Sequence, residues 1–183
     1  MNNIIKEDRL LKVLTSVNDW LKFAESKNTM LIAFNAASIF GIAQLYQLEI
    51  VKKCEYVTQY LFFVIILLAF SAVIAMVSFV PRIKILKGGF FESSTTPNCL
   101  FYEYLKQRSE VEIIQDVCET TAVDFSRFEL DIANQIQQNS NIASKKLSYF
   151  TIAIWLTMAG YISIPLAFIF WLFNHIDKSV ITN

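Results

Sequence analysis

The side chains that most often carry catalysis or bind metals are scarce in this chain of 183 residues. There is one histidine, His175, and the cysteines Cys54, Cys99 and Cys118 lack the paired spacing of a zinc site or a disulfide framework. No histidine pairs with a serine or cysteine in a recognisable nucleophile motif, and the four glycines form no phosphate-binding loop. We therefore expect no metal centre and predict that the protein is not an enzyme.

Four acidic residues lie within ten positions of one another and could in principle exchange protons with a substrate. They are Glu110, Glu112, Asp116 and Glu119. Their spacing of two to four residues is also typical of the polar face of a helix, and we interpret them as a solvated face.

Polar residues within the apolar stretches of the chain are more informative, because a membrane makes them costly. Asn35, Ser38 and Gln44 lie in the first apolar stretch, and Ser71 and Ser78 lie in the second. Small and amide side chains of this kind favour close packing and hydrogen bonds between membrane helices. A lining for a water-filled pore is the alternative interpretation.

These polar residues belong to three apolar runs that dominate the composition. Hydrophobic residues make up 55% of the chain, and they concentrate in 30–46, 60–80 and 147–173. About 20 apolar residues cross the hydrocarbon core of a bilayer as a helix. The sequence therefore predicts an all-α integral membrane protein with three transmembrane helices.

Two of these spans are joined to amphipathic segments without an obvious break. Residues 3–28 carry an apolar stripe at helical spacing and run directly into the first span, since no glycine or proline occurs before Gly41. A second stripe, at Phe125, Phe128, Ile132 and Ile136, runs into the third span. We predict that this second helix starts near Val123, is capped by Thr120 or Thr121, and reaches about 50 residues with Pro165 inside it.

A third amphipathic helix is expected between the second and third spans. Thr96 and Pro97 form a helix start, and apolar residues then recur through residues 98–119. Because an apolar stripe needs a partner to bury it, we expect this helix and the two extensions to form a small helical bundle.

Basic residues near the spans favour a cytoplasmic location for the N-terminus and for residues 81–146. The predicted organisation is a cytoplasmic amphipathic helix at 1–28, spans at 29–49, 60–80 and 147–173, an external loop at 50–59, a cytoplasmic helical region at 81–146 and an external tail at 174–183.

Two stretches of the sequence resemble a known family. Residues 19–28 (DWLKFAESKN), followed by LIAFNAA at 31–37, and residues 135–146 (QIQQNSNIASKK), which lead into the last span, are similar to the Pycsar transmembrane effectors. The order of two early spans, a helical insert and a late span is also similar. The resemblance covers about residues 15–173.

This resemblance implies a non-enzymatic effector of bacterial antiphage defence in the inner membrane. A pyrimidine nucleotide cyclase would make the activating ligand, a cyclic pyrimidine mononucleotide (cCMP or cUMP). The effector would then impair the membrane, so that the infected cell dies or stops growing. The expected partners are the lipid bilayer and further copies of this chain, with no nucleic acid, and no cofactor is expected beyond the ligand.

Under this interpretation we expect basic residues of the cytoplasmic region to bind the nucleotide phosphate and aromatic residues to stack on its base. The candidates for the phosphate are Arg82, Lys84, Arg108 and Arg127, of which Arg108 and Arg127 are expected on helices that could face each other; those for the base are Tyr104, Tyr102 and Phe128. Ordinary surface ion pairs are the alternative interpretation of each residue.

The unbroken helix at the first span suggests how a signal reaches the membrane. A helix without a hinge transmits a displacement that a flexible joint would absorb. We assign helix packing and coupling to Lys27, Asn28, Asn35, Ser38 and Gln44. The alternative function is a non-enzymatic inner-membrane scaffold or assembly subunit.

Overall fold

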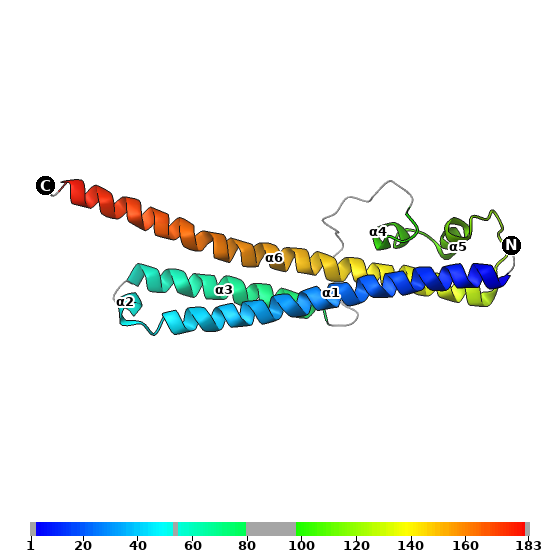
Figure 1. The fold of residues 1–183 in the computed structure, drawn as a ribbon, viewed down its shortest axis with the longest axis horizontal. Coiled ribbons are helices and arrows are strands. Elements are labelled where there is room, and N and C mark those ends of the chain that lie inside the picture. The colour runs from blue at the N-terminus through cyan, green and yellow to red at the C-terminus, as the bar shows by residue number, and fades with distance from the viewer. Residues whose placement is uncertain (1–2, 53–54, 80–97, 182–183) are drawn as a thin grey trace. The chain divides into compact units, whose positions relative to one another are not determined.

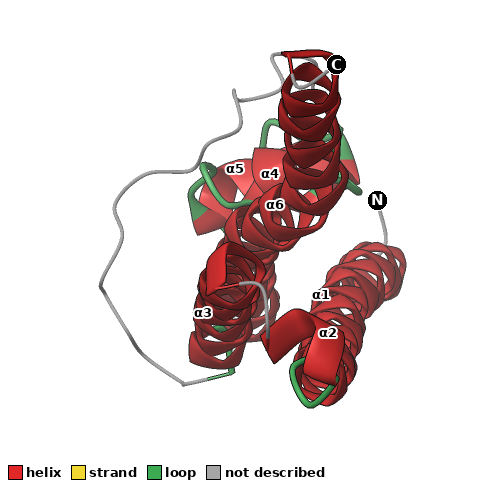
Figure 2. Cartoon of the chain, turned by 90° about the vertical axis from the view of Figure 1, so that its left-hand side faces the viewer, coloured by secondary structure: helices red, strands yellow, loops and turns green. Residues whose placement is uncertain are grey.

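The computed structural model of the protein describes residues 3–52, 55–79 and 98–181, and every regular element in that part of the chain is a helix (Figures 1 and 2). In chain order the helices are α1 (Asn3–Leu45), α2 (Glu49–Lys52), α3 (Glu55–Val77), α4 (Tyr102–Leu105), α5 (Glu110–Cys118) and α6 (Arg127–Ile181). Helices α1, α3 and α6 are long and apolar enough to cross a membrane. The predicted class, an all-α membrane protein with three such helices, is confirmed.

The chain divides into two compact units. The first, which we call the bundle unit, consists of residues 1–28 and 78–150; the second, the span unit, consists of 29–77 and 151–183. Helices α1 and α6 each contribute residues to both units. Their continuity agrees with the predicted absence of a break before the first and third spans.

The core of the bundle unit is built from the stripes that the sequence predicted. Leu10 and Val17 of α1 are fully buried with Ile113 and Ile114 of α5 and Ile136 of α6. Burying a side chain of this size stabilises the fold by about 1.5–3 kcal/mol, so these contacts hold α5 against the two long helices. One expected member of the stripe does not take part, because Phe128 is 52% exposed.

The expected single helix over 98–119 is wrong, since the structure divides it into α4 and α5. The division has a local cause. Ser109 accepts a hydrogen bond from the backbone of Glu112, while the Glu112 side chain accepts from the backbone of Ser109. This capping box starts a new helix and ends the previous turn. Residues Thr96 and Pro97 lie outside the described residues.

The expected start of the last helix near Val123 is also wrong, because α6 begins at Arg127. Ser126 and Glu129 form the reciprocal contacts of a second capping box: the Ser126 backbone donates to Glu129 Oε2 (2.8 Å), and the Glu129 backbone donates to Ser126 Oγ (3.2 Å). The true cap follows Thr121 by five residues. The Ser-x-x-Glu pattern starts the helix because it satisfies two backbone donors, which a threonine alone does not.

The span unit packs the later part of α1 against α3 and α6. Leu61, Val64 and Leu68 of α3 are buried, and a Cβ placed on Gly160 would lie 3.7 Å from both Val64 and Leu68. An added Cβ would therefore make ordinary van der Waals contact, so α6 packs on α3 at this position without requiring a glycine. The segment 50–59, predicted to be a loop, contains the end of α2 and the first residues of α3.

Candidate functional site

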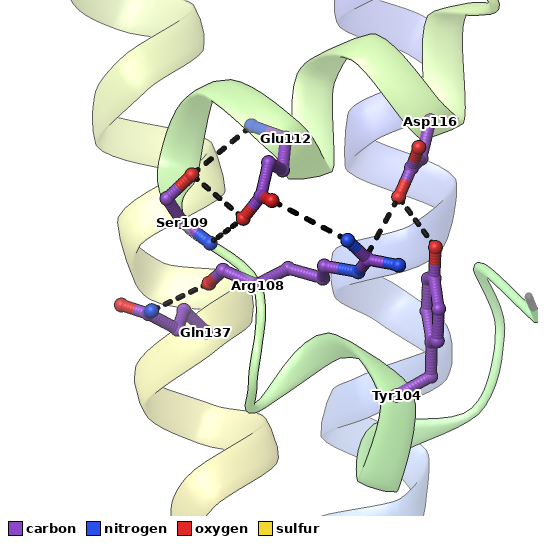
Figure 3. A network of polar contacts seen from close by, with 6 residues as sticks. All are labelled: Tyr104, Arg108, Ser109, Glu112, Asp116 and Gln137. Atoms are coloured by element: carbon purple, nitrogen blue, oxygen red, sulfur yellow. Dashed lines mark hydrogen bonds and ion pairs between the residues drawn. The ribbon is translucent and has the colours of Figure 1, made fainter. Parts of the chain in front are cut away.

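Arg108, a predicted phosphate ligand, lies in a polar network of the bundle unit (Figure 3). Its Nη1 is 3.3 Å from Glu112 Oε1, its Nε is 3.8 Å from Asp116 Oδ2, and its guanidinium carbon lies 4.6 Å from the centroid of the Tyr104 ring. The Tyr104 hydroxyl donates to Asp116 Oδ2 (2.6 Å). The guanidinium is therefore matched by two carboxylates and an aromatic face within the protein itself.

The electrostatics of this network follow from its hydrogen bonds. The hydrogen bond to Asp116 is the main cause that raises the pKa of Tyr104, because an acceptor carboxylate favours the protonated phenol. The hydrogen bond from the Ser109 backbone is the main cause that lowers the pKa of Glu112. Gln137 of α6 donates to the backbone carbonyl of Arg108 (2.5 Å), which ties the network to the long helix.

The structure does not bring Arg108 and Arg127 together. Arg108 is tied to α6 at Gln137, whereas Arg127 is exposed at the first residue of that helix, ten residues earlier. Ten residues of helix span about 15 Å. The expectation that both arginines lie on helices is wrong for Arg108, which lies between α4 and α5. Arg82 and Lys84 lie outside the described residues.

The aromatic candidates for base stacking are also dispersed. Tyr104 packs in the core and against Arg108. Tyr102 lies 5.4 Å from Trp20 and 4.8 Å from Phe101, measured between ring centroids, in an aromatic cluster where α1 meets the residues before α4. Phe128, which is 52% exposed, lies in the first turn of α6. The three rings do not form one platform.

A second polar network holds α4 on α6 and was not predicted. Ser144 of α6 accepts a hydrogen bond from Lys106 Nζ (3.0 Å) and donates to Glu103 Oε1 (2.6 Å). Lys106 and Glu103 also form an ion pair, and their side chains are only 18% and 9% exposed. A buried charge is tolerated when it is paired and hydrogen-bonded. The Glu103–Lys106 pair has the i,i+3 spacing of a helix ion pair, whereas its contact with Ser144 depends on tertiary packing that no local motif indicates.

Asn28, a predicted coupling residue, joins three parts of the bundle unit. Its Nδ2 lies 3.0 Å from the Ala24 carbonyl, 3.0 Å from Ser78 Oγ and 3.3 Å from the Lys146 carbonyl. Asn28 is fully buried, and Ser78 directly follows α3. One amide thus connects α1, α6 and the end of α3, beside an ion pair of 2.5 Å between Lys146 and Glu25.

Lys27, the neighbouring coupling candidate, rests on aromatic rings. Its Nζ lies 4.5 Å from the centroid of Phe23 and 5.3 Å from that of Phe150. A lysine whose stem follows an apolar surface while its ammonium approaches aromatic faces is typical of a membrane–water boundary. This placement fits an anchor at the end of the first span.

The span unit contains a third network, which connects its three long helices. Asn35 of α1 donates to Ser71 Oγ of α3 (2.9 Å) and accepts from Thr157 Oγ1 of α6 (3.0 Å). Ser71 also donates to the Ala153 carbonyl (2.7 Å). Asn35 and Ser71 are fully buried. The sequence identified Asn35 and Ser71 as polar residues capable of cross-helix bonds but missed Thr157.

The remaining two coupling candidates lie in the span unit, where Ser38 is half-buried and Gln44 is exposed. Ser38 donates to the Phe34 carbonyl (2.7 Å) and forms a short hydrogen bond with the Tyr161 hydroxyl, which connects α1 with α6. Gln44 is exposed near the end of α1.

Within the described part of the chain, no group of three or more acidic, histidine or cysteine side chains is arranged to hold a metal ion.

These networks are suited to holding helices in register, and their neutral or paired groups offer no activated nucleophile.

A family model for the Pycsar effector protein domain matches residues 9–173 of the chain. No curated protein and no solved structure matches the chain. The matched region includes all three networks.

Proposed function

The chain belongs to the Pycsar effector family and is an effector of antiphage defence; we propose that it answers a cyclic pyrimidine mononucleotide by impairing the inner membrane. The family implies a partner system that generates the cyclic nucleotide. The proposed effector is not an enzyme: the ligand changes its conformation, and the membrane-spanning helices respond.

The observation that supports this proposal is the continuity of the two long helices. α1 runs from Asn3 to Leu45 and α6 from Arg127 to Ile181, and each supplies residues to both the bundle unit and the span unit. No turn separates the two parts of either helix. A ligand that rearranges the bundle unit therefore acts on the same helices that enter the membrane.

The energy needed for such a response is modest. A ligand shifts a two-state equilibrium from 1:99 to 99:1 when its affinities for the two states differ by about 5.5 kcal/mol. Asn28 and the Glu25–Lys146 ion pair are contacts that a rearrangement of α1 against α6 would change, because they join these two helices close to the boundary of the bundle unit in the sequence.

We propose that the bundle unit faces the cytoplasm, where the nucleotide is made. The basic residues that flank the spans favour this orientation. We also propose that several copies act together, because three spans hardly enclose a water-filled path, whereas an assembly of such chains does.

The proposal is tested by the uptake of propidium in bacteria that express the protein and receive cCMP or cUMP. We expect uptake only with a cyclic pyrimidine nucleotide, and none with cAMP. Absence of uptake with every nucleotide, in cells whose inner membrane contains the protein, would contradict the proposal and favour a scaffold.

The role of helix continuity is tested by inserting two glycines after Lys27, which breaks α1 where the two units meet in the sequence. We expect normal membrane insertion but no nucleotide-dependent uptake. The matched control is the same insertion after Gln47, in the turn that follows α1. Unchanged uptake in the Lys27 variant would show that continuity is not required.

A further inference from the structure

One corner of the bundle unit brings together chemistry that none of the networks above uses. We call it the α5–α6 corner: residues 119–129, which connect α5 to the first turn of α6, with Lys6 and Arg9 of α1 beside them. Cys118, the last residue of α5, lies 3.9 Å from the Lys6 carbonyl, and Phe125 packs on the same core. The corner thus combines two cations, an aromatic ring and the acidic side chain of Glu129.

Glu129 is unusual because half of its carboxylate has no partner. The residue is 3% exposed, and its Oε2 accepts from the Ser126 backbone (2.8 Å). Its Oε1 is buried and accepts no hydrogen bond from any described group. Leaving a buried acceptor unsatisfied costs about 1–3 kcal/mol, and more when the group is charged. The arrangement is suited to an added hydrogen-bond donor.

The cations of the corner are placed to favour an anion. Lys6 Nζ lies 6.0 Å from the centroid of Phe125, and Arg9 Nη1 lies 4.0 Å from Glu119, whose side chain is 83% exposed. An exposed ion pair of this length contributes little and is easily exchanged. Burial and then the charge of Glu129 raise the pKa of the Cys118 thiol, whereas Lys6 and Arg9 lower it, so the three charges all act on one side chain.

We propose that the α5–α6 corner binds the cyclic nucleotide and selects cytosine over uracil. The inference rests on the proposed function and assigns its ligand site. The exocyclic amine of cytosine donates a hydrogen bond to Glu129 Oε1, the pyrimidine ring stacks on Phe125, and Lys6 and Arg9 bind the cyclic phosphate.

The base preference follows from hydrogen-bond chemistry. Cytosine presents an amine donor at the position where uracil presents a carbonyl acceptor. The Glu129 Oε1 acceptor matches the amine of cytosine, whereas the carbonyl of uracil presents a second acceptor to it. With uracil, Glu129 Oε1 would stay without a donor, and a buried acceptor left unsatisfied costs about 1–3 kcal/mol, which corresponds to a ratio of dissociation constants between about 5 and 150.

The burial of Glu129 gives this site a means of signalling. A ligand reaches Oε1 only if the corner opens, and the residues between α5 and α6 are not helical. That segment begins at Glu119, which adopts the left-handed conformation (φ 51°) that a non-glycine residue adopts at a cost of about 1–2 kcal/mol. Binding therefore favours an opened bundle over the closed one, which is the differential affinity that an effector requires.

The test compares the binding of cCMP and cUMP to the purified full-length protein in lipid nanodiscs, by calorimetry, for the wild type and Glu129→Gln. Glutamine at this position also satisfies the capping box, and its amide donates to the uracil carbonyl. We expect the wild type to bind cCMP at least fivefold more tightly than cUMP, and Glu129→Gln to lose or reverse this preference.

Two further variants separate the base from the phosphate. Asp131→Asn changes an exposed acid two residues further along α6 and should leave the preference intact. Lys6→Gln should weaken the binding of cCMP and of cUMP by a similar factor, because it removes a contact with the phosphate that both nucleotides share. Circular dichroism of each variant reports whether the helices are retained.

The outcomes distinguish the site from the function. Propidium uptake with a cyclic pyrimidine nucleotide, combined with tighter binding of cUMP or with an unchanged preference in Glu129→Gln, would overturn the site and leave the proposed function standing. Absence of both binding and uptake with either nucleotide would overturn the proposed function, and the site with it.

Discussion

The bundle unit and the span unit both use polar side chains to hold helices together, but they use different chemistry. In the bundle unit, Arg108 is matched by Glu112 and Asp116, and its side chain remains 38% exposed. In the span unit, Asn35 and Ser71 are neutral and fully buried. The contrast shows two ways of satisfying polar groups. The bundle unit uses charges that are paired with opposite charges, even where they are mostly buried, as at Lys106 and Glu103, whereas the three-helix network of the span unit is made of neutral amides and hydroxyls.

The largest effect is expected from placing a charge in the neutral network. Asn35→Asp removes the donor to Ser71 and introduces a carboxylate at a fully buried position among membrane helices. A charge at the centre of a membrane helix costs about 2.5–3.5 kcal/mol. We expect a loss of about 3 kcal/mol in the free energy of unfolding, measured by titrating the protein from mild detergent into dodecyl sulfate.

The matched control for this change is Asn134→Asp in the bundle unit. Asn134 accepts from Gln138 through its side-chain oxygen, and an aspartate keeps that acceptor. We expect its effect to be small. Equal losses in the two variants would remove the distinction between the units.

A smaller effect on the free energy of unfolding is expected from removing one hydrogen bond of the charged network around Arg108. Tyr104→Phe removes the hydroxyl that donates to Asp116 at 2.6 Å, and a hydrogen bond to a charged group contributes about 1.5–3 kcal/mol. Because Asp116 is partly exposed and also contacts Arg108, we expect a loss of about 1–2 kcal/mol. Urea unfolding followed by Trp20 fluorescence, with Trp155 and Trp171 replaced by phenylalanine, measures it.

Tyr102→Phe is the control, since this ring lies in the aromatic cluster with Trp20. We expect little change in stability from loss of its hydroxyl. A Tyr104→Phe protein as stable as this control would mean that the contact with Asp116 contributes nothing.

The smallest effect on stability is expected from lowering the pH. The pKa of Glu112 is lowered in the folded state below its ordinary value of 4.5, so its contribution to stability is present above that value and is lost as the pH falls through the folded pKa. We expect the bundle unit to weaken over this range by the same fluorescence assay. Glu112→Gln, which retains the cap, should show less of this dependence; identical pH profiles would contradict the assignment.

The long elements could be predicted from the sequence because their signals extend over many residues. The three apolar runs indicated α1, α3 and α6, and the stripe through Ile132 and Ile136 indicated the buried face of α6 in the bundle unit. Asn35 and Ser71 were recognisable because a buried polar side chain in an apolar run needs a partner.

The short elements and the sites depended on signals that reach only a few residues. The Ser109–Glu112 and Ser126–Glu129 capping boxes are present in the sequence and would have located the starts of α5 and α6. The placement of Arg108 beside Asp116 follows from the turn between α4 and α5, and the unpartnered oxygen of Glu129 follows from tertiary packing. Neither is encoded in a local pattern.

Purified protein in phospholipid vesicles that contain a trapped fluorescent dye gives the most direct test that a cyclic pyrimidine nucleotide makes this chain impair a membrane. We expect release of the dye when cCMP is added, and no release without nucleotide or with cAMP. Vesicles that keep their dye although calorimetry shows the nucleotide bound to the protein would contradict it.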